Sequence, residues 1–165
     1  HPKADSLRFK YLPHLYFPGA ECTIWVDANI GFRTDPADLV HLARESGLAI
    51  RPHPQRDCVY QEGPAILAGH RAPQEIVQAQ VRAMEAADYP AHNGLSETNV
   101  LVRFDRPAVN EFNRAMWADI CRWASWRDQL SFNYVAWQMG IEWSNIPGGR
   151  IRNHPLFTYR YRGPK

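Results

Sequence analysis

Short apolar strands alternate with helical segments along this chain, and this alternation is the feature that most limits its possible folds. The first clear strand is Ile24–Val26, a helix is predicted over 36–46, and a second strand is predicted over 48–50. Asp35 is a typical helix-capping residue, and Gly47 is a typical terminator. A strand, a helix and a strand in this order predict one βαβ unit.

The rest of the chain continues the pattern. The other predicted helices cover 58–68, 73–88, 107–123 and 125–140, and the other predicted strands cover 99–102, 141–146 and 157–161. Ser125 is expected to cap the last helix, with Asp128 at the N3 position of a capping box. Together these elements predict an α/β fold with a mixed or mostly parallel sheet, in a single domain over residues 1–165.

Composition narrows the class of protein further. A formal net charge of +2 over 165 residues is too small to indicate a nucleic-acid partner. No apolar run approaches the roughly 18 residues that cross a membrane. The three cysteines form no CxxC pair, so a reducing, cytoplasmic compartment is the default expectation, with a lumenal one as the alternative.

The strand Ile24–Val26 ends at Asp27, and Asn29 follows two residues later. An acidic residue at the end of a buried strand lies at the sheet edge where open α/β folds bind ligands. Carboxylate and carboxamide oxygens suit a hard cation such as Mg²⁺ or Mn²⁺ that also holds phosphate oxygens. The alternative is that Asp27 only stabilises a turn.

Two further polar clusters adjoin predicted strands. His53, Arg56 and Asp57 follow the second strand, and Arg56 lies at a predicted helix start, where the helix dipole favours anions. Glu97 and Asn99 lie at the entrance to a later strand, where a carboxylate could act as a base or bind an acceptor hydroxyl. The alternatives are that Asp57 only caps a helix, that Arg56 is only a surface charge, and that Glu97 faces water.

The last clusters lie near the carboxyl end of the chain. Arg127, Asp128 and Gln129 gather at one predicted helix start, and capping alone explains only Asp128. His154 follows Asn153 in a predicted loop and could complete a metal site, although an exposed loop histidine is the alternative. No GxSxG, HExxH or GxxxxGK[ST] motif occurs in the sequence, so serine hydrolases, zincins and P-loop enzymes find no support.

Several of these motifs occur in an order that resembles a known family. They are Lys10–His14, Tyr16–Pro18, Ile24–Asp27, Asp35–Pro36, His53 with Arg56–Asp57, Gly94–Arg103 and Arg127–Phe132. The set resembles a family of plant and bacterial glycosyltransferases, once filed as a domain of unknown function, whose plant members are linked to cell-wall polysaccharide. The resemblance covers about residues 10–135, and it rests on the order of the motifs.

The resemblance implies a GT-A fold, which is Rossmann-like, and a metal-dependent transferase that uses a nucleotide sugar. The Asp27 motif stands where such enzymes carry a DxD motif, and retaining family 8 glycosyltransferases are a more distant likeness. On this analogy Asp27, Asn29 and His154 hold Mn²⁺ or Mg²⁺. The donor is expected to be a UDP-sugar, the acceptor is a glycan, and the protein is bacterial and cytoplasmic, with membrane-peripheral association left open.

The same analogy assigns the other clusters to substrates. Asp128 and Gln129 are expected near the donor sugar, and Glu97 is expected near the acceptor, so these three are the predicted catalytic residues. Further substrate contacts are expected from His53, Arg56, Asp57, Asn99 and Arg127.

Two departures from the family pattern affect these expectations. The motif here is Asp-Ala-Asn, which predicts weaker or water-assisted metal binding. Only 26 residues precede it, whereas a GT-A domain normally places nucleotide-binding strands there. The main rival is therefore a non-catalytic domain that binds a carbohydrate or a nucleotide sugar. A two-metal phosphohydrolase is disfavoured because the sequence has no tight carboxylate cluster.

Overall fold

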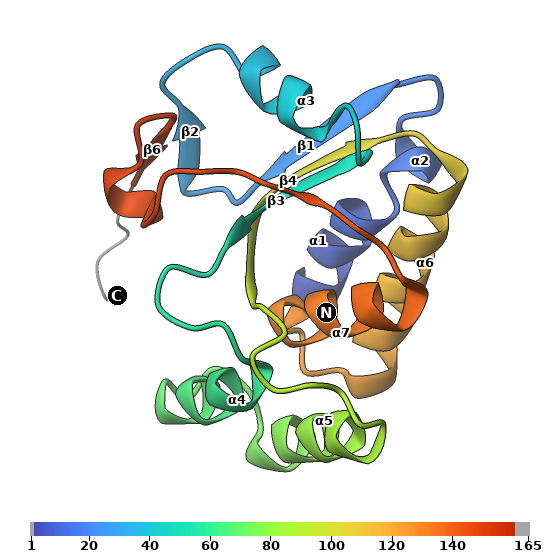
Figure 1. Cartoon of the computed structure of the whole chain (residues 1–165), viewed down its shortest axis with the longest axis vertical. Coiled ribbons are helices and arrows are strands. Elements are labelled where there is room, and N and C mark those ends of the chain that lie inside the picture. The colour runs from blue at the N-terminus through green and yellow to red at the C-terminus, as the bar shows by residue number, and fades with distance from the viewer. Residues whose placement is uncertain (1, 161–165) are drawn as a thin grey trace.

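The computed structural model describes residues 2–160 and contains a mixed four-stranded sheet (Figure 1). The strands lie in the order β1 (Cys22–Val26), β4 (Ser96–Phe104), β3 (Leu48–Pro52) and β5 (Ser144–Asn145). β4 is antiparallel to both β1 and β3, while β5 is parallel to β3. The predicted mixed sheet is therefore confirmed, although β4 separates the two strands of the predicted βαβ unit.

Helices cover both faces of this sheet, as the prediction of an α/β fold requires. Their bounds are α1 Pro2–Tyr11, α2 Pro13–Tyr16, α3 Ala37–Ala43, α4 Val59–Ala68, α5 Gln74–Ala86, α6 Pro107–Trp123 and α7 Asp128–Met139, followed by the 3₁₀ turn η1 Ile151–Asn153. A separate two-stranded sheet pairs β2 (Ile30–Phe32) with β6 (Phe157–Tyr159). The predicted strand residue Tyr161 lies outside the described residues.

Alternation along the strands builds two hydrophobic cores. Leu48, Ile50 and Leu101 point to one face, where α1, α6 and α7 pack. Ala49 and Val102 point to the other face, which α3 and the β2–β6 pair cover. Successive side chains of a strand face opposite sides, so a strand with apolar residues at every position is buried on both faces. A third cluster joins α4 and α5 to α7.

Local signals explain most helix boundaries. Asp35 Oδ1 accepts the backbone N–H of Ala37 at 2.9 Å, which confirms the predicted helix start. Phe112, Met116 and Ile120 are buried along one face of α6 with the predicted period. The predicted capping box at 125–128 is wrong. Arg127 is the N-cap residue of α7 and makes no side-chain cap hydrogen bond.

Candidate functional site

The carboxyl end of β1 meets the start of β4 at one edge of the sheet. Asp27 directly follows β1, and its backbone N–H donates to the carbonyl oxygen of Asn99 at 3.0 Å. Glu97 and Asn99 are two residues apart on β4, so their side chains share a face. All three side chains line two adjoining cavities. This edge therefore brings together the predicted residues of two separate motifs.

The Asp27 carboxylate is half-buried and held in one orientation. Its Oδ1 accepts the indole N–H of Trp25 at 3.0 Å. Burial raises the pKa of Asp27 above its usual range, while the charge of Lys10 and the Trp25 hydrogen bond oppose the rise. A carboxylate that is costly to bury in its charged form gains from a cation or a hydrogen-bond donor.

The first of the two cavities, the Asp128 cavity, has a volume of about 320 Å³. It is lined by Lys3, Ser6, Leu7, Lys10, Trp25, Asp27, Glu97, Thr98, Asn99, Trp126, Arg127, Asp128 and Gln129. One oxygen of Asp128, Oδ2, accepts hydrogen bonds from Lys10 Nζ at 2.5 Å and from the Tyr11 hydroxyl at 2.8 Å. The guanidinium of Arg127 donates to the carbonyl oxygen of Arg71. Asp128 thus lies on the same cavity as Asp27, with two donors from α1 fixing it.

A buried arginine fixes Glu97. Arg51 is 1% exposed, and its Nη1 donates to Glu97 Oε2 at 2.5 Å and to Asn99 Oδ1 at 3.1 Å. Burial lowers the pKa of Arg51, and the Glu97 carboxylate opposes that shift. Arg51 is not among the site residues predicted from the sequence. Its signal was a charged residue directly after the apolar run 48–50.

The second cavity, the arginine cavity, has a volume of about 450 Å³ and carries both signs of charge. Its lining combines the polar residues of the sheet edge with a group of arginines: Asp27, Asn29, Ile30, His53, Pro54, Gln55, Arg56, Arg71, Glu97, Asn99, Arg150, Ile151, Arg152 and Tyr159. Arginine binds phosphate oxygens in a bidentate manner. Carboxylate and amide oxygens beside arginines suit a phosphate and its cation together.

His53 and Arg56 form a wall of the arginine cavity. His53 Nδ1 accepts the backbone N–H groups of Gln55 and Arg56 at 3.2 and 2.9 Å, so the proton of the neutral ring lies on Nε2. Burial, with the charges of Arg56 and Arg51, lowers the pKa of His53 to about 4. Arg56 Nη2 lies 3.2 Å from Nε2, and its Nε donates to the buried Glu62 at 2.6 Å. The Nε2–H of His53 and the guanidinium of Arg56 therefore place two N–H donors side by side on this wall, where an anionic oxygen could accept from both.

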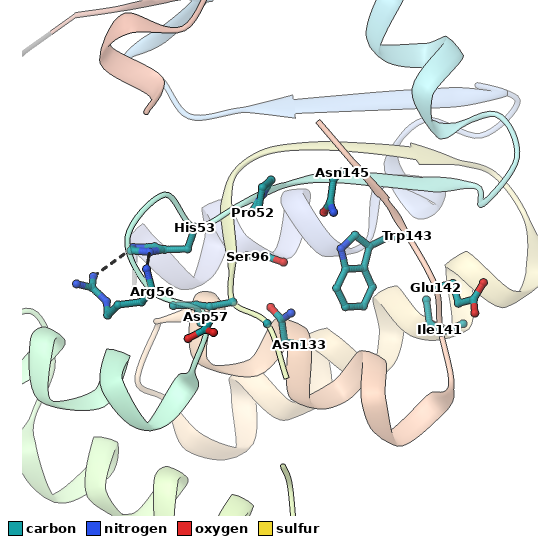
Figure 2. A pocket seen from close by; sticks show the side chains of 12 residues that line it. Pro52, His53, Arg56, Asp57, Ser96, Asn133, Ile141, Glu142, Trp143 and Asn145 are labelled. Atoms are coloured by element: carbon teal, nitrogen blue, oxygen red, sulfur yellow. Dashed lines mark hydrogen bonds between the residues drawn. The ribbon is translucent and has the colours of Figure 1, made fainter. Parts of the chain in front are cut away.

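The same wall borders a third cavity, the Trp143 cavity, of about 480 Å³ (Figure 2). Its lining residues are Pro52, His53, Arg56, Asp57, Gly94, Leu95, Ser96, Asn133, Ile141, Glu142, Trp143 and Asn145. Asp57 belongs to this cavity and pairs with His92 at 2.8 Å. Cys58 is the N-cap residue of α4 and makes no side-chain cap hydrogen bond, so the alternative that Asp57 caps this helix is not what the structure shows.

In the structure, His154 offers no free ring nitrogen to Asp27 and Asn29, the other predicted metal ligands. His154 is 2% exposed. Its Nε2 contacts the carbonyl oxygen of Pro147 at 2.6 Å, and its Nδ1 accepts the N–H of Leu156 at 3.2 Å. Asn29, by contrast, lines the arginine cavity beside Asp27. Among residues 2–160, no group of three His, Cys, Asp or Glu side chains is arranged to hold a metal ion.

The mixed sheet with helices on both faces and a polar cleft at its edge forms an α/β domain that is compatible with a GT-A-like fold. The family described as "TOD1/MUCI70, glycosyltransferase-like domain" matches residues 7–146. The chain therefore belongs to this family of glycosyltransferase-like domains, which confirms the resemblance seen in the sequence.

One curated relative gives a narrower comparison. Over 57 residues the chain is 39% identical to a protein of Arabidopsis thaliana named alkaline ceramidase TOD1. The alignment covers 33% of this chain and 12% of that protein, so the chain spans only a small part of the relative's length. No solved structure matches the chain. In the described part of the chain, every helix is too short or too polar to cross a membrane.

Proposed function

We propose that this domain transfers a sugar from a nucleotide-sugar donor to a hydroxyl group of a glycan acceptor, with the help of a divalent cation. The observation that carries the proposal is the order of polar groups along the cleft. Arginines line one cavity, Asp27 lies where that cavity meets the next, and Asp128 lies in the second. A diphosphate, its cation and a sugar follow one another in the same order.

The cation fits this site only together with the phosphate groups. Asp27 and Asn29 supply oxygen ligands, whereas Arg51 already engages both Glu97 and Asn99. Two protein ligands are too few for a preformed site, but Mg²⁺ commonly binds through one or two protein carboxylates plus substrate phosphates and water. When bound, the cation would neutralise the diphosphate as a leaving group.

The protein's own groups would position the donor and the acceptor. Arg56 and the neutral His53 donate hydrogen bonds to phosphate oxygens and so stabilise the charge of the leaving diphosphate. Asp128, oriented by Lys10 and Tyr11, accepts hydrogen bonds from donor-sugar hydroxyls beside Gln129. Glu97, oriented by Arg51, accepts the hydrogen bond of the acceptor hydroxyl. A UDP-sugar remains the predicted donor, and a cytoplasmic location remains a prediction from the sequence.

The test combines a donor panel with two variants. Purified protein is incubated with several nucleotide sugars and Mn²⁺, and release of nucleoside diphosphate is measured. Asp27→Ala is expected to abolish cation-dependent binding of the diphosphate. Asp128→Asn is expected to lower turnover at least about a hundredfold, because hydrogen bonds to charged groups orient the reacting sugar. Asp38→Asn, an exposed change in α3, is the control and should leave turnover unchanged.

A non-catalytic sugar-binding domain is the second candidate function. It is favoured by one observation, which is that both carboxylates assigned to chemistry, Asp128 and Glu97, already accept charged hydrogen bonds. Tight nucleotide-sugar binding without any hydrolysis or transfer would support this candidate and contradict the first. Because one relative is named a ceramidase, ceramide amide hydrolysis belongs in the same panel, and activity on that substrate alone would contradict both.

A further inference from the structure

We infer that the Trp143 cavity holds the nucleobase of the donor. This inference rests on the proposed function and adds a subsite to it. The cavity shares His53 and Arg56 with the arginine cavity. Figure 2 shows these two residues at one end of the space and Trp143 at the other. A ligand whose phosphates lie against Arg56 can therefore extend its neutral end toward Trp143.

Asn133 is the strongest sign that this cavity binds a polar ligand. It lies on α7, is 2% exposed, and lines the cavity. Neither Nδ2 nor Oδ1 has a hydrogen-bond partner among the described residues. A buried amide without partners destabilises the folded chain, so its retention indicates a compensating role. Gly94 leaves the amide open, because a Cβ there would lie 3.2 Å from Asn133 Nδ2.

The chemistry of a carboxamide matches the edge of a base. Asn133 presents one donor and one acceptor side by side, which is the pattern by which amide side chains bind nucleobases in pairs of hydrogen bonds. Trp143 adds an aromatic ring held by an edge-on contact with Phe132, at 5.6 Å between ring centroids. Bases stack on such rings. Asn145, across the cavity from Asn133 (Figure 2), offers a second amide.

The order of the three cavities favours a base over an acceptor sugar. The Trp143 cavity adjoins the arginine cavity through His53 and Arg56, and the arginine cavity adjoins the Asp128 cavity through Asp27, Glu97 and Asn99. Within residues 2–160, no side chain lines both the Trp143 cavity and the Asp128 cavity. An acceptor in the Trp143 cavity would thus lie on the far side of the diphosphate from the donor sugar. Base, diphosphate and sugar fit the sequence of cavities without this conflict.

Calorimetric titration of the full chain in Mn²⁺ tests the inference. The probes are UDP, CDP, ADP, GDP and inorganic pyrophosphate, which lacks a base. Asn133→Ala and Trp143→Leu should each raise the Kd of the best-binding nucleoside diphosphate about tenfold or more, as loss of stacking or paired hydrogen bonds predicts. The Kd of pyrophosphate should stay within about twofold, which also shows that each variant is folded. Asn153→Ala, an exposed asparagine on η1, is the matched control and should change neither Kd.

The outcomes separate this inference from the function on which it rests. Unchanged nucleoside diphosphate binding in both variants places the base elsewhere and overturns the inference, while the transferase proposal stands. An equal loss for pyrophosphate also overturns it, because the variants would then act through the phosphate site. If the wild-type protein binds neither pyrophosphate nor any of the four nucleotides, the transferase proposal fails with it.

Discussion

Charged residues of the cleft are held by specific neighbours that lie far away in the sequence. Asp128 contacts Lys10 and Tyr11 of α1, and Glu97 contacts Arg51 of β3. Removing one partner of a buried ion pair leaves an uncompensated charge and is costly. The side chains that orient the candidate catalytic groups are therefore part of the site, although they have no motif of their own.

His53 should make the stability of the protein depend on acid pH. Its pKa is about 4 in the folded chain and near 6.5 when the ring is free. Between these values the unfolded chain binds a proton that the folded chain does not, so the free energy of unfolding falls as pH falls from about 6.5 to about 4. His53→Asn keeps an acceptor for the two backbone N–H groups and should lessen this fall.

Urea unfolding at pH 7, 5.5 and 4.5 measures the difference. The matched control is His70→Asn, because His70 is exposed after α4 and has a positive φ that asparagine tolerates. The control should retain the slope of the wild-type protein. Equal slopes in all three proteins would show that another group carries the acid sensitivity.

At the scale of the element, the sequence predicted those helices and strands whose signals are local. Asp35 and Pro107 mark helix starts, and the period of Phe112, Met116 and Ile120 marks a buried helix face. The pairing of β2 with β6 joins residues more than 120 positions apart, and no local signal predicts it. Helix α1 has no clear apolar stripe, so the sequence alone did not predict how it packs against the sheet.

The site shows the same division between local and long-range information. The sequence identified Asp27, Glu97, Asn99 and Asp128, and the structure brings all four to the Asp128 cavity, while their roles stay predictions. The sequence missed Arg51, because the part it plays depends on strand register. The alternation of strands and helices along the sequence could not show that β4 would lie between β1 and β3.

The end of α6 contains a position that glycine should improve. Ala124 has φ 51° and ψ 23° and closes the helix in the left-handed region. The left-handed conformation costs an L-residue about 1–2 kcal/mol. Glycine avoids this cost, but it loses more backbone entropy on folding, which offsets part of the gain. Ala124→Gly should raise the free energy of unfolding by up to about 1 kcal/mol in a urea titration.

The same substitution inside this helix is expected to lower the free energy of unfolding. Ala118 is exposed in the interior of α6, where Ala→Gly costs about 1 kcal/mol. Ala118→Gly therefore serves as the matched control. If both variants are destabilised equally, the left-handed cap does not limit the stability of this helix.

At the scale of the whole molecule, three cavities form one continuous cleft over the sheet edge and the helices beside it. The cleft joins residues of β1, β3, β4 and α7 with the loops that follow β3 and β5. A ligand that spans it would bind only the folded chain, and such binding raises stability by mass action.

The midpoint of thermal unfolding should therefore respond to the cation and the nucleotide together far more than to the cation alone. With Mn²⁺ and UDP at about one hundred times the Kd, the midpoint should rise by about 5–10 °C, which corresponds to roughly 2.7 kcal/mol for a chain of this size. Mn²⁺ alone should shift the midpoint little, because Asp27 and Asn29 are too few ligands. An equal shift with Mn²⁺ alone would point to a complete cation site formed by protein groups.

The reversed direction of β4 has a consequence for how such a cleft can diversify. Because β4 runs antiparallel to β1 and β3, its first residue, Ser96, lies beside Pro52 at the end of β3, and Val100 lies beside Val26 at the end of β1. The segment 87–95 therefore enters the cleft directly from α5, ahead of the strand. Insertions or substitutions there could change which ligand related proteins bind without altering the hydrogen bonds between the strands.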